Sequence, residues 1–245
     1  LYAQWPIDIS TVADFDIIRA NPEGSYILTN DILINIPWVP IGEDESSPFT
    51  GILDGNGYSI TNLQLNDQFE GYLGLIGYNE GIVRNLKLGV VYEQLPEDGG
   101  EAPNYGGRAE FNIYGDKELY VGGIAGYNDG AIQNCEVAIE IFVELNAEDT
   151  DMYVGGVAGY NNGTIEDTDI TVQIDAEYHY DVTSEGEKYV GSIAGYHSNQ
   201  AEIIGCYYNR IVASQEVSPK ACGNEDEADF GSYEAIGTTS TLSFW

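Results

Sequence analysis

Carboxylates are the residues whose number and spacing point most directly to chemistry in this chain. Asp and Glu number 41 against 8 Lys and Arg, so the 245 residues carry a net charge of −33. Clustered carboxylates supply the oxygen ligands that Ca²⁺ takes, about six to eight per ion. The acidic segment with Glu148, Asp149 and Asp151 is therefore a candidate calcium site, and a solvated acidic surface is the alternative. We expect no cofactor other than calcium.

Patterns typical of enzyme active sites are missing from the sequence. The HExxH, GxSxG and GxxxxGK[ST] motifs do not occur. A glycoside hydrolase needs only two carboxylates across one bond, but among 41 acids some pair can always be chosen, so a pair has no weight. The sequence favours a protein without catalysis, with a calcium-assisted polysaccharide lyase or hydrolase as the alternative.

Tyrosine is the second residue type with a bearing on function, because the chain has 19 of them. A tyrosine offers a flat apolar face and a hydroxyl group, which suits sugar rings and protein partners. Tyr92, Tyr105 and Tyr114 lie within or near Pro96–Gly115, a segment rich in Gly, Pro and charge. These three are the candidate ligand-binding residues, and ordinary β-sheet composition is the alternative.

The charge balance excludes one class of partner. A chain at −33 cannot neutralise phosphates, so we expect no nucleic acid partner. No stretch approaches the roughly 18–20 apolar residues of a membrane span, so we expect no membrane insertion in this segment. The chain starts at Leu1, and we expect an extracellular or cell-surface bacterial protein whose signal peptide has been removed.

Three cysteines are too few for a disulfide scaffold and lack the spacing of a zinc site. One disulfide at most can form. Cys206 and Cys222 are the plausible pair, because both lie in the less regular C-terminal part.

An internal repeat decides the fold prediction. Tyr120–Gly130 reads YVGGIAGYNDG and Tyr153–Gly163 reads YVGGVAGYNNG, with related copies at Tyr72–Gly81 and Tyr189–Gly195. A period in the range of about 20–50 residues indicates a solenoid, propeller or array. The first step is longer than the others, which marks Pro96–Gly115 as an insertion. Marker glycines of the four copies are Gly77, Gly126, Gly159 and Gly195.

Alternating apolar residues follow each marker, as in Cys135–Val143, and this period of two predicts strands with one buried face. Short strands between Gly and Asn turns favour stacked parallel coils, in which equivalent side chains form columns. An aromatic ladder is expected from Tyr78, Tyr127, Tyr160 and Tyr196. An inner column is expected from Leu86, Cys135, Thr168 and Cys206, and a column at tight corners, where Asn tolerates left-handed backbone, from Asn79, Asn128 and Asn161.

The combination of WVPIG, FTGILDGNGYSITNL and repeated YVGGIAGYNDGAIQNC resembles the GLUG-motif repeat proteins, which are bacterial surface and secreted proteins. The resemblance covers roughly Tyr26 to Val212. It implies an all-β, right-handed parallel β-helix of about five coils and an adhesin function.

We therefore expect one structural domain in three parts. Residues 1–48 form an N-terminal cap with entry strands, 49–217 the GLUG-type repeats with the insertion 96–115, and 218–245 a C-terminal cap or tail. The predicted function is a non-catalytic binding or adhesion module for a glycan or a protein of a host or neighbouring cell. A structural spacer of a larger surface protein is a further alternative.

Overall fold

A computed structural model of the chain describes residues 5–66, 71–89, 109–115, 117–179, 183, 186–211, 221–224 and 234–235. The fold is mostly β, and every strand pairing is parallel. Two short helices lie near the N-terminus, a 3₁₀ turn at Val12–Asp14 and α1 at Phe15–Ala20. The prediction of an all-β chain with parallel strands is confirmed at this level.

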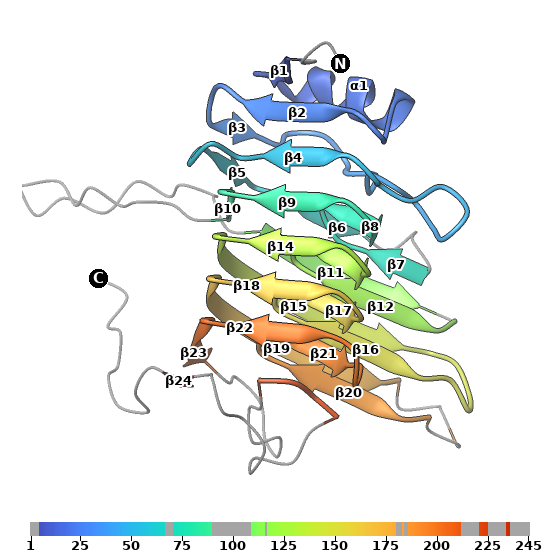
Figure 1. Cartoon of the computed structure of the whole chain (residues 1–245). Coiled ribbons are helices and arrows are strands. Elements are labelled where there is room, and N and C mark those ends of the chain that lie inside the picture. Colours follow the sequence, from blue (N-terminus) through green and yellow to red (C-terminus); the bar gives the residue numbers. More distant parts are fainter. Residues whose placement is uncertain are drawn as a thin grey trace, which may run out of the picture.

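Four repeat units each contribute one strand to each of four sheets, always in the same order (Figure 1). The first strand of each unit enters one four-stranded sheet: β7 (Gly71–Leu73), β12 (Leu119–Gly122), β16 (Met152–Gly155) and β20 (Lys188–Gly191). The second enters the other four-stranded sheet: β8 (Ile76–Asn79), β13 (Ala125–Asn128), β17 (Ala158–Asn161) and β21 (Ala194–His197).

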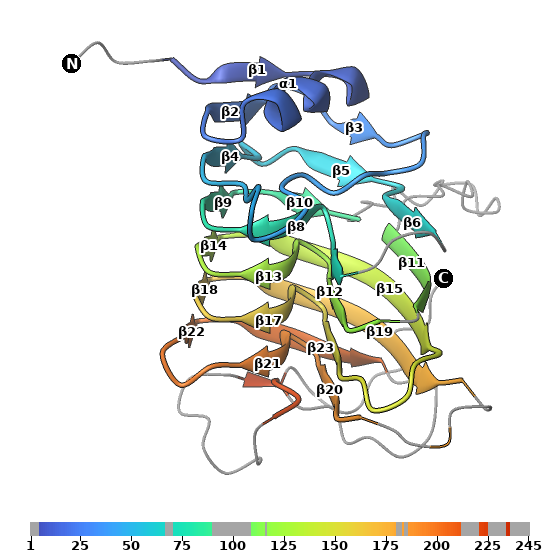
Figure 2. The same ribbon diagram turned by 90° about the vertical axis from the view of Figure 1, so that its right-hand side faces the viewer.

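The third and fourth strands of each unit enter two larger sheets, which also receive the N-terminal strands (Figure 2). The seven-stranded sheet holds β1 (Ile7–Ile9), β2 (Ser25–Leu28), β4 (Ile52–Asp54), β9 (Ile82–Arg84), β14 (Ala131–Gln133), β18 (Thr164–Glu166) and β22 (Glu202–Ile204). The nine-stranded sheet holds β3 (Ile32–Leu33), β5 (Ser59–Thr61), β10 (Lys87–Leu88), β15 (Glu136–Leu145), β19 (Asp169–Tyr178), β23 (Tyr207–Ile211) and β24 (Glu234–Ala235) on its main path, with β6 (Gln64–Asn66) and β11 (Ala109–Gly115) paired beside it.

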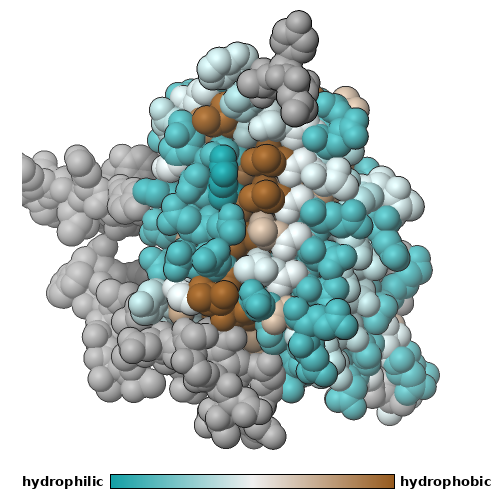
Figure 3. Space-filling view, in the orientation of Figure 1, coloured by the Kyte–Doolittle hydropathy of each residue, from teal (hydrophilic) through white to brown (hydrophobic). Residues whose placement is uncertain are grey.

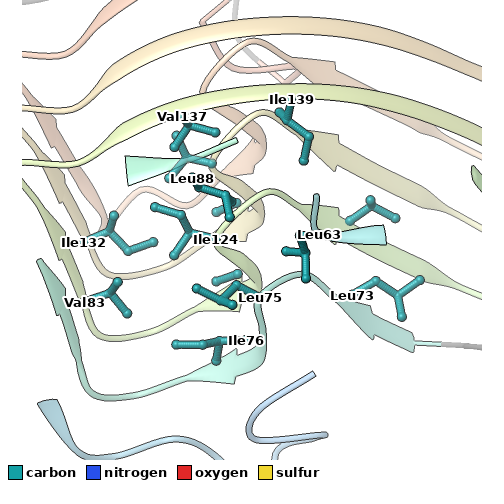
Figure 4. Packing of buried hydrophobic residues seen from close by; sticks show 14 of the residues in the cluster. Leu63, Leu73, Leu75, Ile76, Val83, Leu88, Ile124, Ile132, Val137 and Ile139 are labelled. Atoms are coloured by element: carbon teal, nitrogen blue, oxygen red, sulfur yellow. The ribbon is translucent and has the colours of Figure 1, made fainter. Parts of the chain in front are cut away.

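The core lies between these sheets and is built from aliphatic side chains that repeat in register. In β15 the odd-numbered residues from Val137 to Leu145 are buried and the intervening ones are not, which is the period-two pattern of a strand with one face inward. Side chains from successive units point toward one another in the interior (Figure 4). The expected inner column of Leu86, Cys135, Thr168 and Cys206 is buried throughout.

The insertion separates two strands, β10 and β11, that pair with the same strand, β15. Leu88 pairs with Val137 in β15, and Ala109 pairs with Ile139 of the same strand. Only one β15 residue separates the two partners, so β10 and β11 together form the strand that β15 faces. The extra chain therefore runs from 90 to 108, outside the described residues. The prediction of an insertion over Pro96–Gly115 is wrong at its C-terminal end, because β11 belongs to the sheet.

The N-terminal end of the sheets is covered by α1, whose Phe15 and Ile18 are fully buried. Asp14 fixes the entry to the helix, since its carboxylate accepts hydrogen bonds from the backbone and hydroxyl groups of Ser10 and Thr11. Phe15 meets Trp38 edge-on at 5.0 Å between ring centroids. This packing gives the first parallel strands an apolar cover that an open sheet end would lack.

Candidate ligand-binding surfaces

The tyrosine column predicted from the repeat is present, and a second column lies beside it. Neighbouring rings in the first column, Tyr78, Tyr127, Tyr160 and Tyr196, stack at 4.6–4.8 Å between centroids. Neighbouring rings in the second, Tyr72, Tyr120, Tyr153 and Tyr189, stack at 4.8–5.1 Å. The two columns meet edge-to-face, for example Tyr72 with Tyr78 at 5.3 Å. We call these eight rings the tyrosine ladder.

Each column follows from strand register. Parallel pairing places Tyr120 beside Tyr153 and Tyr127 beside Tyr160, so the rings repeat at the spacing of the strands. Within each column, the inner rings stack face to face on both neighbours, so their flat faces are covered. The ladder therefore offers ring edges and hydroxyl groups along its length, and a flat face only where a column ends. The second column was missed, although the YVGG tyrosine that forms it recurs in the sequence.

Burial raises the pKa of several tyrosines in the ladder. Desolvation by burial raises the pKa of Tyr78 to about 12, with Asp129, Glu45, Tyr72 and Glu80 adding to the shift. Burial, with nearby charges, raises the pKa of Tyr120, Tyr127 and Tyr153 well above the ordinary tyrosine value. These four phenols are therefore neutral hydrogen-bonding groups at every physiological pH.

We expect alkaline unfolding to begin above the ordinary tyrosine pKa. A group whose pKa is higher in the folded state than in the unfolded state contributes stability that is fully present below the unfolded pKa, near 10 for tyrosine. This stability is lost as the pH rises through the folded pKa, which is about 12 for Tyr78. Tyrosinate absorbance followed together with circular dichroism should show ladder ionisation coinciding with unfolding. Ionisation of all 19 tyrosines near pH 10 with the native spectrum intact would contradict this.

The asparagine column lies inside the molecule and not at left-handed corners. Asn79, Asn128 and Asn161 are fully buried in strands. The amide of Asn79 donates to Asn128 Oδ1 and that of Asn128 to Asn161 Oδ1, each at 2.7 Å. Asn161 Nδ2 lies 3.3 Å from His197 Nδ1, which ends the column. The left-handed part of the prediction is wrong, because none of the three has a positive φ. Each does end its strand beside a turn, where for example the Gly81 N–H donates to Asn79 Oδ1 at 3.2 Å.

The left-handed corners lie six residues further on in the first three units and eight residues further on, at Gly205, in the fourth. Positive φ angles occur at Asn85 (53°), Asn134 (51°), Asp167 (47°) and Gly205 (63°), between the strands of the two larger sheets. Asn and Asp tolerate this region and Gly enters it at no cost. These positions align in the repeats, and that recurring polar residue was the signal by which they could have been found.

A polar groove of about 350 Å³ runs over these corners. Asn134 Nδ2 donates to Asn85 Oδ1 at 2.7 Å, and Asn85 Nδ2 donates to Asp54 Oδ1 at 2.9 Å. These bonds hold the amides in line along the stack. We call this surface the corner groove; it is lined by Asn56, Gly57, Asn85, Leu86, Lys87, Asn134, Cys135, Glu136, Asp167 and Asp169.

The outer face of the seven-stranded sheet carries a narrow apolar stripe between hydrophilic margins (Figure 3). In-register Ile52, Ile82 and Ala131 are half-buried there. Beside them Arg84 donates to Asp54 at 2.8 Å. None of the described helices is long and apolar enough to cross a membrane.

Two of the predicted calcium ligands, Glu148 and Asp151, accept hydrogen bonds from other residues. Glu148 accepts a hydrogen bond from the Thr183 hydroxyl at 2.7 Å. The Asp151 carboxylate accepts from the Tyr153 hydroxyl and the Glu187 backbone N–H. Among the described residues, no group of three or more His, Cys, Asp or Glu side chains is arranged to hold a metal ion.

The structure describes only some of the other predicted site residues. Tyr92 and Tyr105 lie outside the described residues, and Tyr114 is part of β11. Cys206 and Cys222 form no disulfide, and both are buried. Cys206 belongs to the inner column between β22 and β23, whereas Cys222 bridges to Ala194 beside β21.

Comparisons with known proteins assign no family, and no family model matches the chain. Over 104 residues, 42% of the chain, it is 35% identical to a protein of Evansella cellulosilytica named "Putative Gly-rich membrane protein". The match spans 10% of that protein, so the chain covers about a tenth of its length. A crystal structure of a "putative immunoglobulin A1 protease" from Bacteroides ovatus aligns over 94% of this chain and 83% of that one, with 17% identity and a TM-score of 0.40.

Proposed function

We propose that the chain is a non-catalytic, extracellular binding module of the GLUG-repeat class, built as a right-handed parallel β-helix of about five coils. The constant order in which each repeat unit supplies strands to four parallel sheets supports the winding. Right-handedness is what parallel crossover connections almost always adopt. The partner is a glycan or a glycosylated protein on a host or neighbouring cell.

The corner groove is the observation that carries this proposal. Its amides and carboxylates come from successive repeat units at one position, so the hydrogen-bonding groups recur at the strand spacing. An Asn side chain can both donate and accept, as each hydroxyl of a sugar does. A linear polyol lying along the stack would meet equivalent groups on each unit. A glycan chain is the ligand class that fits such a row.

The test is a panel of polysaccharides and host glycoproteins, run with calcium and with chelator, scored for retained protein and for newly released sugar ends. The variant Asn134→Gly/Asp167→Gly removes two groove side chains and keeps the left-handed backbone, as Gly205 does in the fourth unit. We expect it to weaken retention at least tenfold. Asn62→Gly, at φ 56° outside the groove, is the matched control and should retain the ligand.

Three outcomes would contradict the proposal. Release of sugar ends would make the protein a lyase or hydrolase. Retention that survives the groove variant and is lost when residues 90–108 are deleted would place the ligand on the insertion; this deletion spares β11. Neither retention nor release with any member of the panel, with the native fold intact, would favour a structural spacer.

A further inference from the structure

The tyrosine ladder ends at a pocket that the corner groove does not share. Tyr72 heads its column: one face stacks on Tyr120 at 4.8 Å and its edges meet Tyr78 and Tyr127. Tyr72 also lines a pocket with Asp44, Glu45 and Ser46. At this end of the column, an aromatic ring borders open space.

An acidic loop between Ile41 and Phe49 lies beside β8, where a further repeat unit would continue the tyrosine ladder. Ile41 bridges to Ile76, and Phe49 bridges to Asn79. Seven residues separate Ile41 from Phe49, whereas only two separate Ile76 from Asn79, so the loop is longer than the strand segment it pairs with. Backbone bonds hold both ends of the loop, since Tyr78 N–H donates to Gly42 at 2.7 Å and Phe49 N–H donates to Tyr78 at 2.9 Å. The extra residues carry Asp44 and Glu45 to the end of the ladder.

The loop holds one carboxylate in a fixed position. Asp44 Oδ1 accepts hydrogen bonds from the backbone and hydroxyl groups of Ser46 and Ser47, at 2.6–3.3 Å. These bonds lower the pKa of Asp44, with the Ser46 hydroxyl as the largest cause, so the group is ionised. Asp44 and Glu45 line the same pocket as the Tyr72 ring. Burial raises the pKa of Tyr72, and charge from Glu45, Glu118 and Asp44 adds to the shift.

Elsewhere in the chain, an aromatic ring and a carboxylate together hold a cationic side chain, that of Arg19. The Arg19 guanidinium lies 4.5 Å from the centroid of the Trp38 ring. It also donates to Asp16 at 2.9 Å and to the Val39 carbonyl at 2.6 Å. An aromatic face attracts a cation through its quadrupole, and a carboxylate adds charge attraction. The Tyr72 pocket presents the same two kinds of group without a cationic side chain among its lining residues.

We propose that the pocket of Tyr72, Asp44, Glu45 and Ser46 binds an organic cation, an alkylammonium or guanidinium group such as a Lys or Arg side chain of a partner protein. A hard metal ion would need about six oxygen ligands, and the aromatic ring supplies none. A weakly hydrated organic cation gains from the ring and from the carboxylates together.

The test is an NMR titration of the whole ¹⁵N-labelled chain with tetramethylammonium, methylguanidinium and an Arg-containing peptide, at physiological ionic strength to screen general attraction to the −33 surface. We expect saturable shifts at Ser46 and Tyr72. Tyr72→Leu should weaken binding about tenfold and Glu45→Gln about fivefold. Tyr72→Phe keeps the ring and should bind within twofold of the natural chain.

Glu202→Gln is the control, because Glu202 is an exposed carboxylate on the seven-stranded sheet. An equal loss in this variant would show general charge attraction and overturn the proposal. So would unchanged affinity in Tyr72→Leu, or Ca²⁺ shifting the same signals at lower concentration than tetramethylammonium. Should Tyr72→Leu unfold, Tyr72→Phe and Glu45→Gln decide the question. Response to the peptide but to neither small cation would also contradict a cation pocket.

Discussion

Gly122→Ala should destabilise the protein by about 3 kcal/mol or more, a cost at the upper end of overpacking. A Cβ at Gly122 would press on the carbonyl oxygen of Ala125 and lie 2.6 Å from Ala158 Cα and 2.7 Å from Gly159 N. These are backbone atoms of its own and the next repeat unit, so no rotamer change relieves the contact. Urea unfolding followed by circular dichroism would measure the loss.

Gly57→Asn is the matched control for added volume at a glycine. A Cβ there meets nothing within 4 Å, and the φ of 81° is one that Asn accepts at modest cost. We expect a loss below about 1 kcal/mol. If Gly122→Ala cost no more than this control, the close approach of neighbouring units at the first glycine of the motif would be disproved.

This glycine shows how far the sequence determines the fold. YVGG recurs because a strand must approach the next unit closely, and Gly155 repeats the contact with Ala158 and Ala194. Period-two burial in β15 follows from its alternating residues as predicted. The parallel strands and the first tyrosine column could therefore be predicted, since both depend on spacing within each repeat.

The candidate sites were less predictable, because they depend on which way side chains point across units. Asn79 and Asn85 are both polar residues beside a turn in the sequence. Only the three-dimensional stack buries the first and places the second at a left-handed corner. The carboxylates of Glu148 and Asp151 are close in sequence, but each accepts from a different residue about 35 positions further along the chain. Sequence proximity could not reveal those partners.

The buried asparagine column makes the second large prediction. Asn128 accepts from Asn79 and donates to Asn161, and its side chain is fully buried. In Asn128→Asp the carboxylate can still accept from Asn79. A charged oxygen would, however, replace Asn128 Nδ2, which now donates to Asn161 Oδ1 at 2.7 Å, and would face that acceptor. A buried charge left without its partner costs about 3–5 kcal/mol. We expect this loss at neutral pH.

The pH dependence of Asn128→Asp separates the hydrogen bond from simple packing. Burial beside an acceptor raises the pKa of the new carboxyl above its unfolded value near 3.9. The neutral acid can donate to Asn161, so the penalty is relieved as pH falls through the raised folded pKa and is full above it. Unfolding midpoints of the variant relative to the natural chain should therefore converge toward acid pH. Asn30→Asp, at an exposed turn, should show no such convergence. A pH-independent gap for Asn128→Asp would mean that Asn161 does not need this donor, and that the column is held by packing alone.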